Sequence, residues 1–307
     1  MERIRQAWTH LGQFILSPYA ALICASLFWS GNFIVGRALK GEVPPVSLNF
    51  WRWMVALIIL LPMSLGQLLR HREDILSSWK LILGLGLTGI ATFHICVYTA
   101  LVQTTAINAL IILSTSPMVI VVIAWVIFKE GLGWYQGIGI VISLVGALIL
   151  ICHGDMTTLM NFEFNRGDLW MVFAVPLWSV YSILLKKRPT NLPQLVLLTS
   201  SVMSGVALMI PFYLASLYMG QVLALNGNNI LAILYISIFA SILAFFFWNW
   251  GVASIGPVQA GMYIHFMPFF GAVLSVFFLE ERLAMFHAIG ALFVGTGIIL
   301  TSRQAKK

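Results

Sequence analysis

The chain has 307 residues, of which 60% are hydrophobic and only 9% are charged. Soluble domains have about 45–50% apolar and about 25% charged residues, so this composition cannot cover a water-facing surface. We therefore set aside a soluble enzyme and expect a membrane protein. The net charge of +7 comes from short basic clusters between apolar runs, which indicates membrane orientation rather than a nucleic-acid partner.

Ten apolar segments separated by polar residues predict ten membrane-spanning helices. In chain order they cover residues 18–38, 44–68, 78–101, 104–128, 132–152, 167–186, 192–216, 229–252, 257–279 and 283–302. Most connections are very short, so neighbouring spans alternate in direction and no soluble domain fits between them. The external connection at 153–166 separates a first five-helix repeat at 18–152 from a second at 167–302.

The ends of the chain and its cysteines add little chemistry. Residues 1–17 are basic and have no cleavage site, so we expect a cytoplasmic lead-in, matched by a basic cytoplasmic tail at 303–307. Cys24, Cys96 and Cys152 lie in or beside apolar runs without a C-x-x-C pair. This scattered set argues against a disulfide framework and against a metal cluster.

The second half of the chain repeats the first. Two shifts, of 151 and 149 residues, bring matching residues together: Pro268 onto Pro117, Ala260 onto Ala109 and Glu281 onto Glu130 by the first, and Trp178 onto Trp29 by the second. Each repeat has five spans, an odd number, so the second copy enters the membrane upside down. The predicted fold class is an all-α polytopic membrane protein with ten transmembrane helices as two inverted five-helix repeats, an architecture that recurs in secondary transporters.

The Lys and Arg residues set the expected orientation. With the N-terminus inside, twelve of them fall on the inner side and four on the outer side, and Arg52 alone lies within a span. Basic residues accumulate on the cytoplasmic side of membrane proteins. We therefore expect a multi-pass protein of the cell inner membrane with both termini cytoplasmic.

Several motifs carry a resemblance to a known family. They are FWSGNFIVGRAL at 28–39, GEVPP followed by FWRW at 41–53, FWNWGVASIGPVQAGMYIHFMP at 247–268, LEERL at 279–283 and a His-x-x-Gly at 287–290. The chain resembles, over about 18–302, the ten-helix EamA-type members of the drug/metabolite transporter superfamily. The resemblance implies two inverted repeats, a central cavity lined mainly by spans 1, 3, 4, 6, 8 and 9, and typically export of amino acids or other small metabolites.

The same resemblance breaks down at one position. Members of the family often have Gly-Glu where span four ends, whereas this chain has Lys129-Glu130 there and Glu280-Glu281 in the second copy. We therefore assign no role to these carboxylates.

Arg52 is the one permanent charge well inside a predicted span. Charges within a membrane are costly and mark a solute pathway or a buried pair. One interpretation is a site for a substrate carboxylate. The other is that Arg52 extends outward to the headgroups or pairs with Glu42 or Glu281. We favour the second, structural interpretation, because span two is not expected to line the cavity.

His94 and Tyr98 lie four residues apart, so they share one face of span three. His94 is a candidate for binding substrate or carrying a proton, and the alternative is a hydrogen bond between helices. His265 is the same kind of candidate, although its place just before Pro268 is more typical of packing beside a kink.

Aromatic and amide side chains within the spans complete the candidate binding set: Trp29, Asn32, Asn108, Trp178, Tyr181, Trp248 and Tyr263. They either line a pocket for a small amphipathic solute or serve in ordinary packing. Pro117 and Pro268 lie in the middle of spans four and nine, where a proline removes a helix hydrogen bond. We expect hinges there, with static curvature as the alternative.

Some features are missing from the sequence. No Asp lies inside a predicted span, every Glu is outside or at a span end, and no nucleotide-binding motif is present. We therefore expect no cofactor, no metal, no ATP drive and no enzyme activity, and carboxylate-based proton coupling lacks a carrier.

The leading hypothesis is a secondary transporter that exports amino acids or related metabolites by alternating access, with the lipid bilayer and a small-molecule substrate as its partners, as a monomer or weak homodimer. An alternative is efflux of lipophilic cations, which the missing intramembrane carboxylate weakens. A lipid-handling membrane enzyme is the third possibility, and it would need an Asp, Glu or His cluster at one membrane face.

Overall fold

The computed structural model describes residues 17–39, 42–129, 131, 133–155, 157–224, 226–279 and 284–302. All regular secondary structure in these ranges is helical, as the composition predicts. The expected lead-in and tail, except for Ser17, lie outside the described residues. So do Glu130, Glu280 and Glu281, on which no role was placed.

The helices follow the predicted spans closely. The first half comprises α2 (Pro18–Ala38), α3 (Pro45–Arg70), α4 (Arg72–Ser77), α5 (Trp79–Leu85), the π-helix η1 (Gly86–Thr92), α6 (Phe93–Gln103), α7 (Ala106–Leu113), α8 (Ser116–Phe128) and α9 (Trp134–Ile151). After the short α10 (Thr157–Met160), the second half comprises α11 (Arg166–Leu185), α12 (Gln194–Tyr218), α13 (Gly227–Tyr235), the π-helix η2 (Ile236–Leu243), α14 (Ala244–Ile255), α15 (Pro257–Gly261), the 3₁₀ turn η3 (Met262–His265), α16 (Phe266–Leu279) and α17 (Met285–Ser302).

Eight helices in the described part of the chain are long and apolar enough to cross a membrane, with lengths of 18–29 residues. They correspond to the first eight predicted spans. The ninth predicted span is divided into α15, η3 and α16, and the tenth is the shorter apolar helix at Met285–Thr301. All ten predicted segments are therefore helical, and the division of span nine has consequences for the site.

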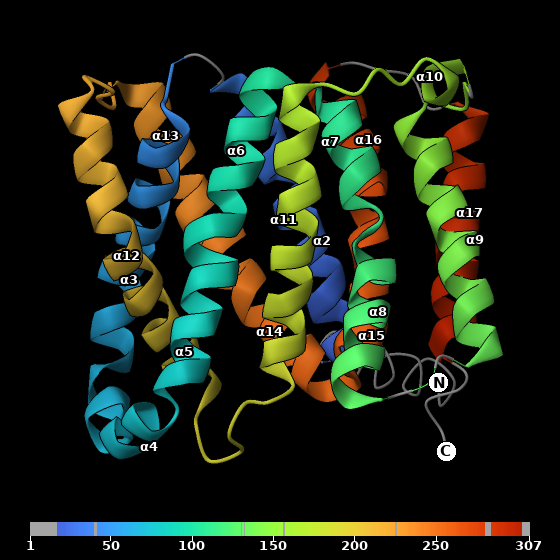
Figure 1. The fold of residues 1–307 in the computed structure, drawn as a ribbon. Coiled ribbons are helices and arrows are strands. Elements are labelled where there is room, and N and C mark those ends of the chain that lie inside the picture. Colours follow the sequence, from blue (N-terminus) through green and yellow to red (C-terminus); the bar gives the residue numbers. More distant parts are fainter. Residues whose placement is uncertain are drawn as a thin grey trace, which may run out of the picture.

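The two halves run in opposite directions (Figure 1). In the third span of the first half, α5 lies at the lower end and α6 at the upper end, whereas in the second half α13 is uppermost and α14 lowermost. In the fourth spans the order is again reversed, with α7 above α8 but α15 below α16. The predicted inversion of the repeats is confirmed.

A π-helix interrupts the third span of each half at the same position. The 151-residue shift carries η1 onto 237–243, which is nearly the extent of η2. The wider turn frees backbone carbonyls, and side chains from other helices occupy them. Asn49 Nδ2 donates to Ile90 O at 3.1 Å and to Ala91 O at 2.9 Å in η1. In η2, the Ala240 carbonyl accepts two bonds, which belong to the site described below.

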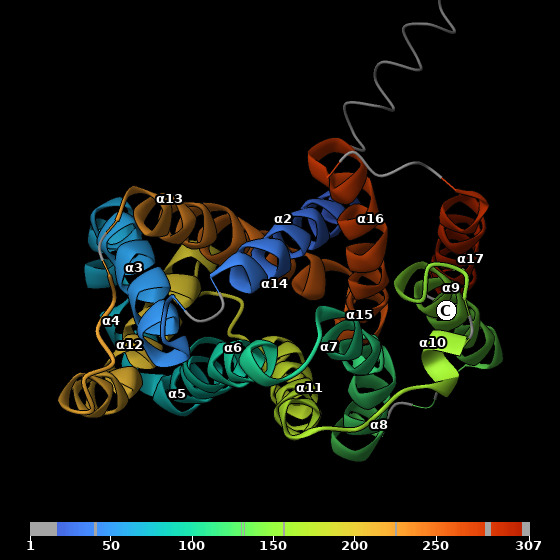
Figure 2. The same ribbon diagram turned by 90° about the horizontal axis from the view of Figure 1, so that it is seen from above.

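The helices α9 and α17 pack as a close pair at one edge of the molecule, with α16 beside them (Figure 2). Glycines allow this approach, because a Cβ at Gly146 would lie 2.8 Å from Gly290 O and one at Gly297 would lie 2.5 Å from Gly139 O. Small residues of this kind permit two membrane helices to pack at short distance.

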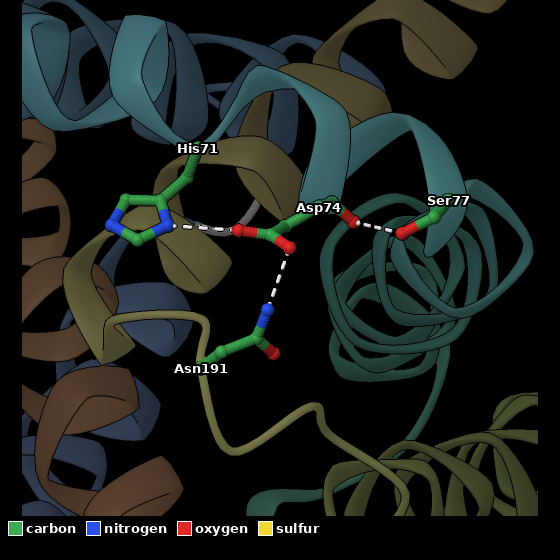
Figure 3. Close-up of polar contacts among 4 residues, drawn as sticks. All are labelled: His71, Asp74, Ser77 and Asn191. Atoms are coloured by element: carbon green, nitrogen blue, oxygen red, sulfur yellow. Dashed lines mark hydrogen bonds and ion pairs between the residues drawn. The ribbon is translucent and has the colours of Figure 1, made fainter.

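Polar contacts join the halves at the end of the molecule that carries α4 (Figure 3). The carboxylate of Asp74 lies 3.0 Å from His71 Nδ1 and accepts from Asn191 Nδ2 at 2.6 Å, and Ser77 Oγ donates to the Asp74 carbonyl at 2.9 Å. Asn191 lies between α11 and α12, so this cluster connects the loops of both repeats.

Candidate functional site

A small cavity lies between the two halves. Its wall consists of Trp29, Asn32, Phe33, Phe93, His94, Val97, Leu113, Trp178, Ile264 and Met267. These residues come from spans 1, 3, 4, 6 and 9, which are five of the six spans that the family resemblance implies. The volume is about 20 Å³, enough for about one water molecule. The structure therefore describes a conformation in which the centre is narrow.

Indole rings from both halves meet at the centre of the cavity wall. Trp29 and Trp178, which are equivalent in the two repeats, contact each other edge to face with ring centroids 5.0 Å apart. Trp248 packs on both, at 5.4 Å from Trp29 and 5.2 Å from Trp178. Contact between equivalent residues places the pseudo-two-fold axis of the repeats between them.

Arg52 turns inward and is completely buried. Its Nε donates to Ser241 Oγ at 2.8 Å, its Nη1 to the Tyr98 hydroxyl at 2.7 Å and its Nη2 to the Ala240 carbonyl at 3.2 Å. The prediction that it reaches the headgroups or pairs with Glu42 is wrong. Helix α3 packs against η2, so the Ala240 carbonyl in the π-turn lies within reach of Arg52 inside the protein. Glu42, in contrast, is exposed. The other suggested partner, Glu281, lies outside the described residues.

A chain of hydrogen bonds connects Arg52 to the cavity wall. The Tyr98 hydroxyl, which accepts from Arg52, donates to Asn32 Oδ1 at 2.8 Å. This bond assigns the orientation of the Asn32 amide. Among the described residues, none accepts a hydrogen bond from Asn32 Nδ2, and Asn32 lines the cavity. The amide is thus a free donor in the cavity wall.

The second repeat contains an equivalent bond with the residue types exchanged. The Tyr181 hydroxyl donates to Asn249 Oδ1 at 2.7 Å. The repeat shifts carry Asn32 onto Tyr181 and Tyr98 onto Asn249, so the two tyrosine–asparagine pairs occupy the same places in the two halves. The position of Arg52 is taken by Ser201 in the second half. The charge therefore lies beside one pair only.

Other buried nitrogen atoms near the centre also lack partners. In the part of the chain that the structure describes, Trp53 Nε1, Trp248 Nε1 and His94 Nδ1 make no hydrogen bond, although the Gly89 carbonyl is close enough to interact with the His94 ring. An indole N–H can only donate, so the unpaired indoles require acceptors. Two unpaired indole N–H donors therefore lie near the cavity, beside a buried positive charge.

The structure separates the ten predicted binding residues into three groups. Four line the cavity: Trp29, Asn32, His94 and Trp178. Three lie directly behind the wall: Tyr98, Tyr181 and Trp248. Three lie elsewhere: Asn108, Tyr263 and His265.

These three have other contacts. Asn108 is in the first turn of α7 and bonds weakly to Asp168 Oδ2 at 3.4 Å, and Tyr263 packs against Tyr19 and Phe266. His265 bonds to Ser143 and to the Ser114 carbonyl, as the packing interpretation expects. Pro117 and Pro268 directly follow irregular turns in spans four and nine.

Sequence reasoning missed the apolar part of the wall: Phe33, Phe93, Val97, Leu113, Ile264 and Met267. One signal was available for two of them. Leu113 and Ile264 are equivalent in the repeats, and each lies four residues before a mid-span proline. In an uninterrupted helix, such a proline leaves the carbonyl four residues earlier without its donor; the structure instead places Pro117 and Pro268 in the first turns of α8 and α16.

An all-helical chain whose two halves are inverted about a narrow central cavity has the construction of a secondary transporter. The family of EamA-like transporters matches residues 16–152 and 165–303. The chain therefore belongs to the EamA-like transporter family, with one EamA domain in each half.

Known relatives agree with this assignment. An uncharacterized transporter of Archaeoglobus fulgidus is 27% identical over 283 residues, which is 92% of this chain and 96% of the relative. The uncharacterized inner membrane transporter YicL of Salmonella typhimurium is 24% identical over 302 residues, which is 93% of this chain and 95% of YicL. A solved crystal structure with 20% identity shares the fold at a TM-score of 0.73 over 93% of this chain and 96% of its own. The protein is thus a multi-pass membrane transporter.

Proposed function

We propose that this transporter exports amino acids or related metabolites that carry a carboxylate, across the cell inner membrane and by alternating access. The observation that carries the proposal is the buried charge of Arg52, which is linked through Tyr98 to a free amide donor of Asn32 in the cavity wall. The direction of transport and the cytoplasmic location of both termini rest on the family resemblance and on the distribution of basic residues.

The charge of Arg52 is not neutralised nearby. Its partners are a phenol, a serine hydroxyl and a backbone carbonyl, and in the described residues no carboxylate lies in the middle of a span. A charge in a low-dielectric interior acts over a longer range than one in water. The cavity beside it therefore favours an anionic group and disfavours a cation, which supports a carboxylate substrate over a cationic drug.

The remainder of the wall suits an apolar substituent. Phe33, Phe93, Val97 and the two central indoles supply aromatic and aliphatic surface around the few polar groups. Pockets for small solutes commonly combine such walls with a small number of placed donors. A small carboxylate metabolite with an apolar substituent satisfies both parts of the site.

A narrow cavity between the two inverted halves is compatible with alternating access. Rocking of one inverted repeat against the other opens the centre first to one side and then to the other. Spans four and nine, whose irregular turns precede Pro117 and Pro268, form the part of the wall at Leu113 and Ile264. In this mechanism they are the moving parts, and a substrate gradient, exchange or proton coupling drives net export.

The experiment is uptake of labelled phenylalanine into proteoliposomes that contain the purified protein, with and without an imposed pH gradient. Two analogues compete: 3-phenylpropionate keeps the carboxylate and lacks the amine, and phenethylamine keeps the amine and lacks the carboxylate. We expect phenylalanine uptake that 3-phenylpropionate inhibits and phenethylamine does not. Inhibition or transport of the amine alone would favour cation efflux and reject the proposal.

A pair of variants sharpens the test. Asn32→Asp places a carboxylate in the cavity wall while Tyr98 can still donate to it, so we expect phenylalanine uptake to fall at least tenfold, the equivalent of about 1.4 kcal/mol. Asn249→Asp makes the same change in the equivalent tyrosine–asparagine pair, which does not line the cavity. We expect this control to keep most of the uptake, and equal loss in both variants would contradict the proposed site.

A further inference from the structure

The helix breaks of spans four and nine meet behind the cavity wall. Span four is interrupted at Ser114 and Thr115, between α7 and α8, and span nine at η3. The 151-residue shift carries Ser114 and Thr115 onto His265 and Phe266, so the two interruptions adjoin in the repeats and coincide at Ser114 and His265. Their cavity sides present Leu113 and Ile264, which are themselves an equivalent pair. Any widening of the cavity at this wall has to move these two breaks apart.

A hydrogen bond from His265 connects the two breaks. His265 Nε2 lies 2.8 Å from the Ser114 carbonyl, and His265 Nδ1 lies 2.6 Å from Ser143 Oγ in α9. A carbonyl only accepts, so Nε2 carries the proton and Nδ1 accepts from the serine hydroxyl. All three residues are buried. The neutral imidazole thus satisfies both ring nitrogens and joins spans four, five and nine.

The bond lies at the symmetry axis of the repeats, because His265 and Ser114 differ by 151 positions. Inverted repeats exchange their conformations when the transporter changes the side to which it opens. After that exchange, residue 114 would take the place of His265 and residue 294 the place of Ser143. The equivalent bonds would therefore need a side-chain donor as long as histidine at residue 114 and a hydroxyl at residue 294. The chain has Ser114, whose hydroxyl bonds to Ile111 O of its own helix at 2.7 Å, and Val294, which has no hydroxyl. The exchanged conformation therefore has no counterpart of this connection.

We propose that His265 is a latch that holds the breaks of spans four and nine together, and that it makes the two sides of the transport cycle unequal in energy. The latch positions the cavity wall and does not touch the substrate. The proposal rests on the alternating access of the proposed function and is independent of the substrate class. A separation of His265 Nε2 and Ser114 O beyond about 3.5 Å breaks the bond, so the latch opens as soon as the wall does.

The test measures access to the cavity from each side of the membrane and needs no substrate. Val97, which lines the cavity, is replaced by cysteine in a chain whose Cys24, Cys96 and Cys152 are changed to alanine. A membrane-impermeant maleimide is then applied to right-side-out and to inside-out vesicles. Two latch variants are compared in this background. His265→Leu removes both bonds at similar volume, and Ser143→Ala removes only the hydroxyl and keeps the test valid if the first variant does not fold.

Ser182→Ala is the matched control. Its hydroxyl is buried like that of Ser143 and has no hydrogen-bond partner in the described residues. We expect His265→Leu to be labelled about three- to fifteenfold faster from one membrane face, the ratio that follows from losing the interhelical bond to Ser114, with little change from the other face. Ser143→Ala keeps that bond and loses only the hydroxyl that orients the imidazole, so we expect a smaller acceleration from the same face. The control should match the parent.

Unchanged labelling in both latch variants would overturn the proposal. So would equal acceleration from both faces, because that result indicates general loosening rather than a latch. Neither outcome depends on phenylalanine uptake, so a failure of the latch and a failure of the proposed substrate can be told apart.

Discussion

The helix breaks in spans four and nine occupy equivalent places in the repeats, yet they are held in different ways. In span nine, hydroxyls of α2 reach the break: Ser26 Oγ donates to Tyr263 O at 2.7 Å and Ser30 Oγ to Met267 O at 2.9 Å. Both hydroxyls also lie within reach of a carbonyl of α2, so each links the two helices.

Apart from the bond of its Ser114 carbonyl to His265, the break in span four is held, in the described structure, by side chains of its own turn. The hydroxyls of Ser114, Thr115 and Ser116 donate to carbonyls three residues earlier, at 2.6–2.7 Å. On the neighbouring α11, Ser179 is equivalent to Ser30, but its hydroxyl bonds to Val175 O of the same helix. Duplication thus produced two similar breaks, of which one is anchored to a neighbouring span through side chains and the other is capped locally. We infer that span nine moves together with α2, whereas span four moves more freely against α11.

Removing the anchors of span nine should give the largest effect. The double variant Ser26→Ala, Ser30→Ala leaves the Tyr263 and Met267 carbonyls without these donors. Interhelical hydrogen bonds in membranes contribute about 0.6 kcal/mol on average and up to about 1.7, so we expect the free energy of unfolding to fall by about 1–3 kcal/mol. Denaturation in detergent, followed by tryptophan fluorescence, measures it. Ser179→Ala is the control, and an equal loss there would remove the distinction between the breaks.

The two central indoles, Trp29 and Trp178, should also contribute unequally to the free energy of unfolding, by a smaller amount than the serine anchors of span nine. Trp29 Nε1 donates to the Ala240 carbonyl at 3.0 Å, whereas Trp178 makes no comparable bond in the described structure. We expect Trp29→Phe to lower the free energy of unfolding by about 1 kcal/mol more than Trp178→Phe, the usual net contribution of one hydrogen bond. Both variants should slow uptake into proteoliposomes because both rings line the cavity. Equal stability of the two would show that the Ala240 bond contributes nothing measurable.

Replacing Pro117 and replacing Pro268 should have different effects: the first should change stability slightly, and the second should slow uptake. Pro117 is at the start of α8, where an N–H has no helical acceptor, so Pro117→Ala should change stability by less than about 0.5 kcal/mol. In Pro268→Ala, the new N–H can bond to Ile264 O and extend α16 back through η3. We expect uptake to slow about three- to tenfold in that variant, because lid and hinge motions limit many turnover rates. Faster uptake in Pro268→Ala than in Pro117→Ala would reject the hinge.

The smallest effect is expected at the locally capped break. Ser116→Ala removes a hydroxyl that bonds only to Leu113 O in the preceding turn. Such local bonds compete with the helix ladder and add little net stability, so the change in unfolding free energy should stay below about 0.5 kcal/mol. A loss comparable to that of the double serine variant would mean that span four is anchored after all.

The sequence was sufficient for the architecture. Ten spans, two repeats and their inversion followed from apolar length, from matching residues and from the odd number of spans, because each depends on the chain alone. The central position of Trp29 and Trp178 was accessible for the same reason, since equivalent residues of inverted repeats can meet at the axis.

The contacts of the site were harder to predict from the sequence. Arg52 bonds to Ser241, a residue 189 positions away, and the carbonyl it also contacts is freed by a π-turn in an ordinary apolar run. Asn108 resembled a pocket residue until Thr105 proved to be the N-cap of α7, which places Asn108 in the first turn. The apolar wall residues were hidden because every helix of a membrane protein is rich in such side chains.

The matching π-helices also bear on how the chain arose. An extra residue in one turn shifts every later side chain around the helix, so acquiring it separately at the same point of two finished halves would require two coordinated rearrangements. The positions of η1 and η2 instead indicate that the wide turn was already present in a five-helix ancestor. Before its gene doubled, that ancestor would have had to pair with an oppositely inserted copy of itself to enclose the same space. Arg52 and its repeat equivalent Ser201 would then be a difference that arose once the two copies, as parts of one chain, could vary separately.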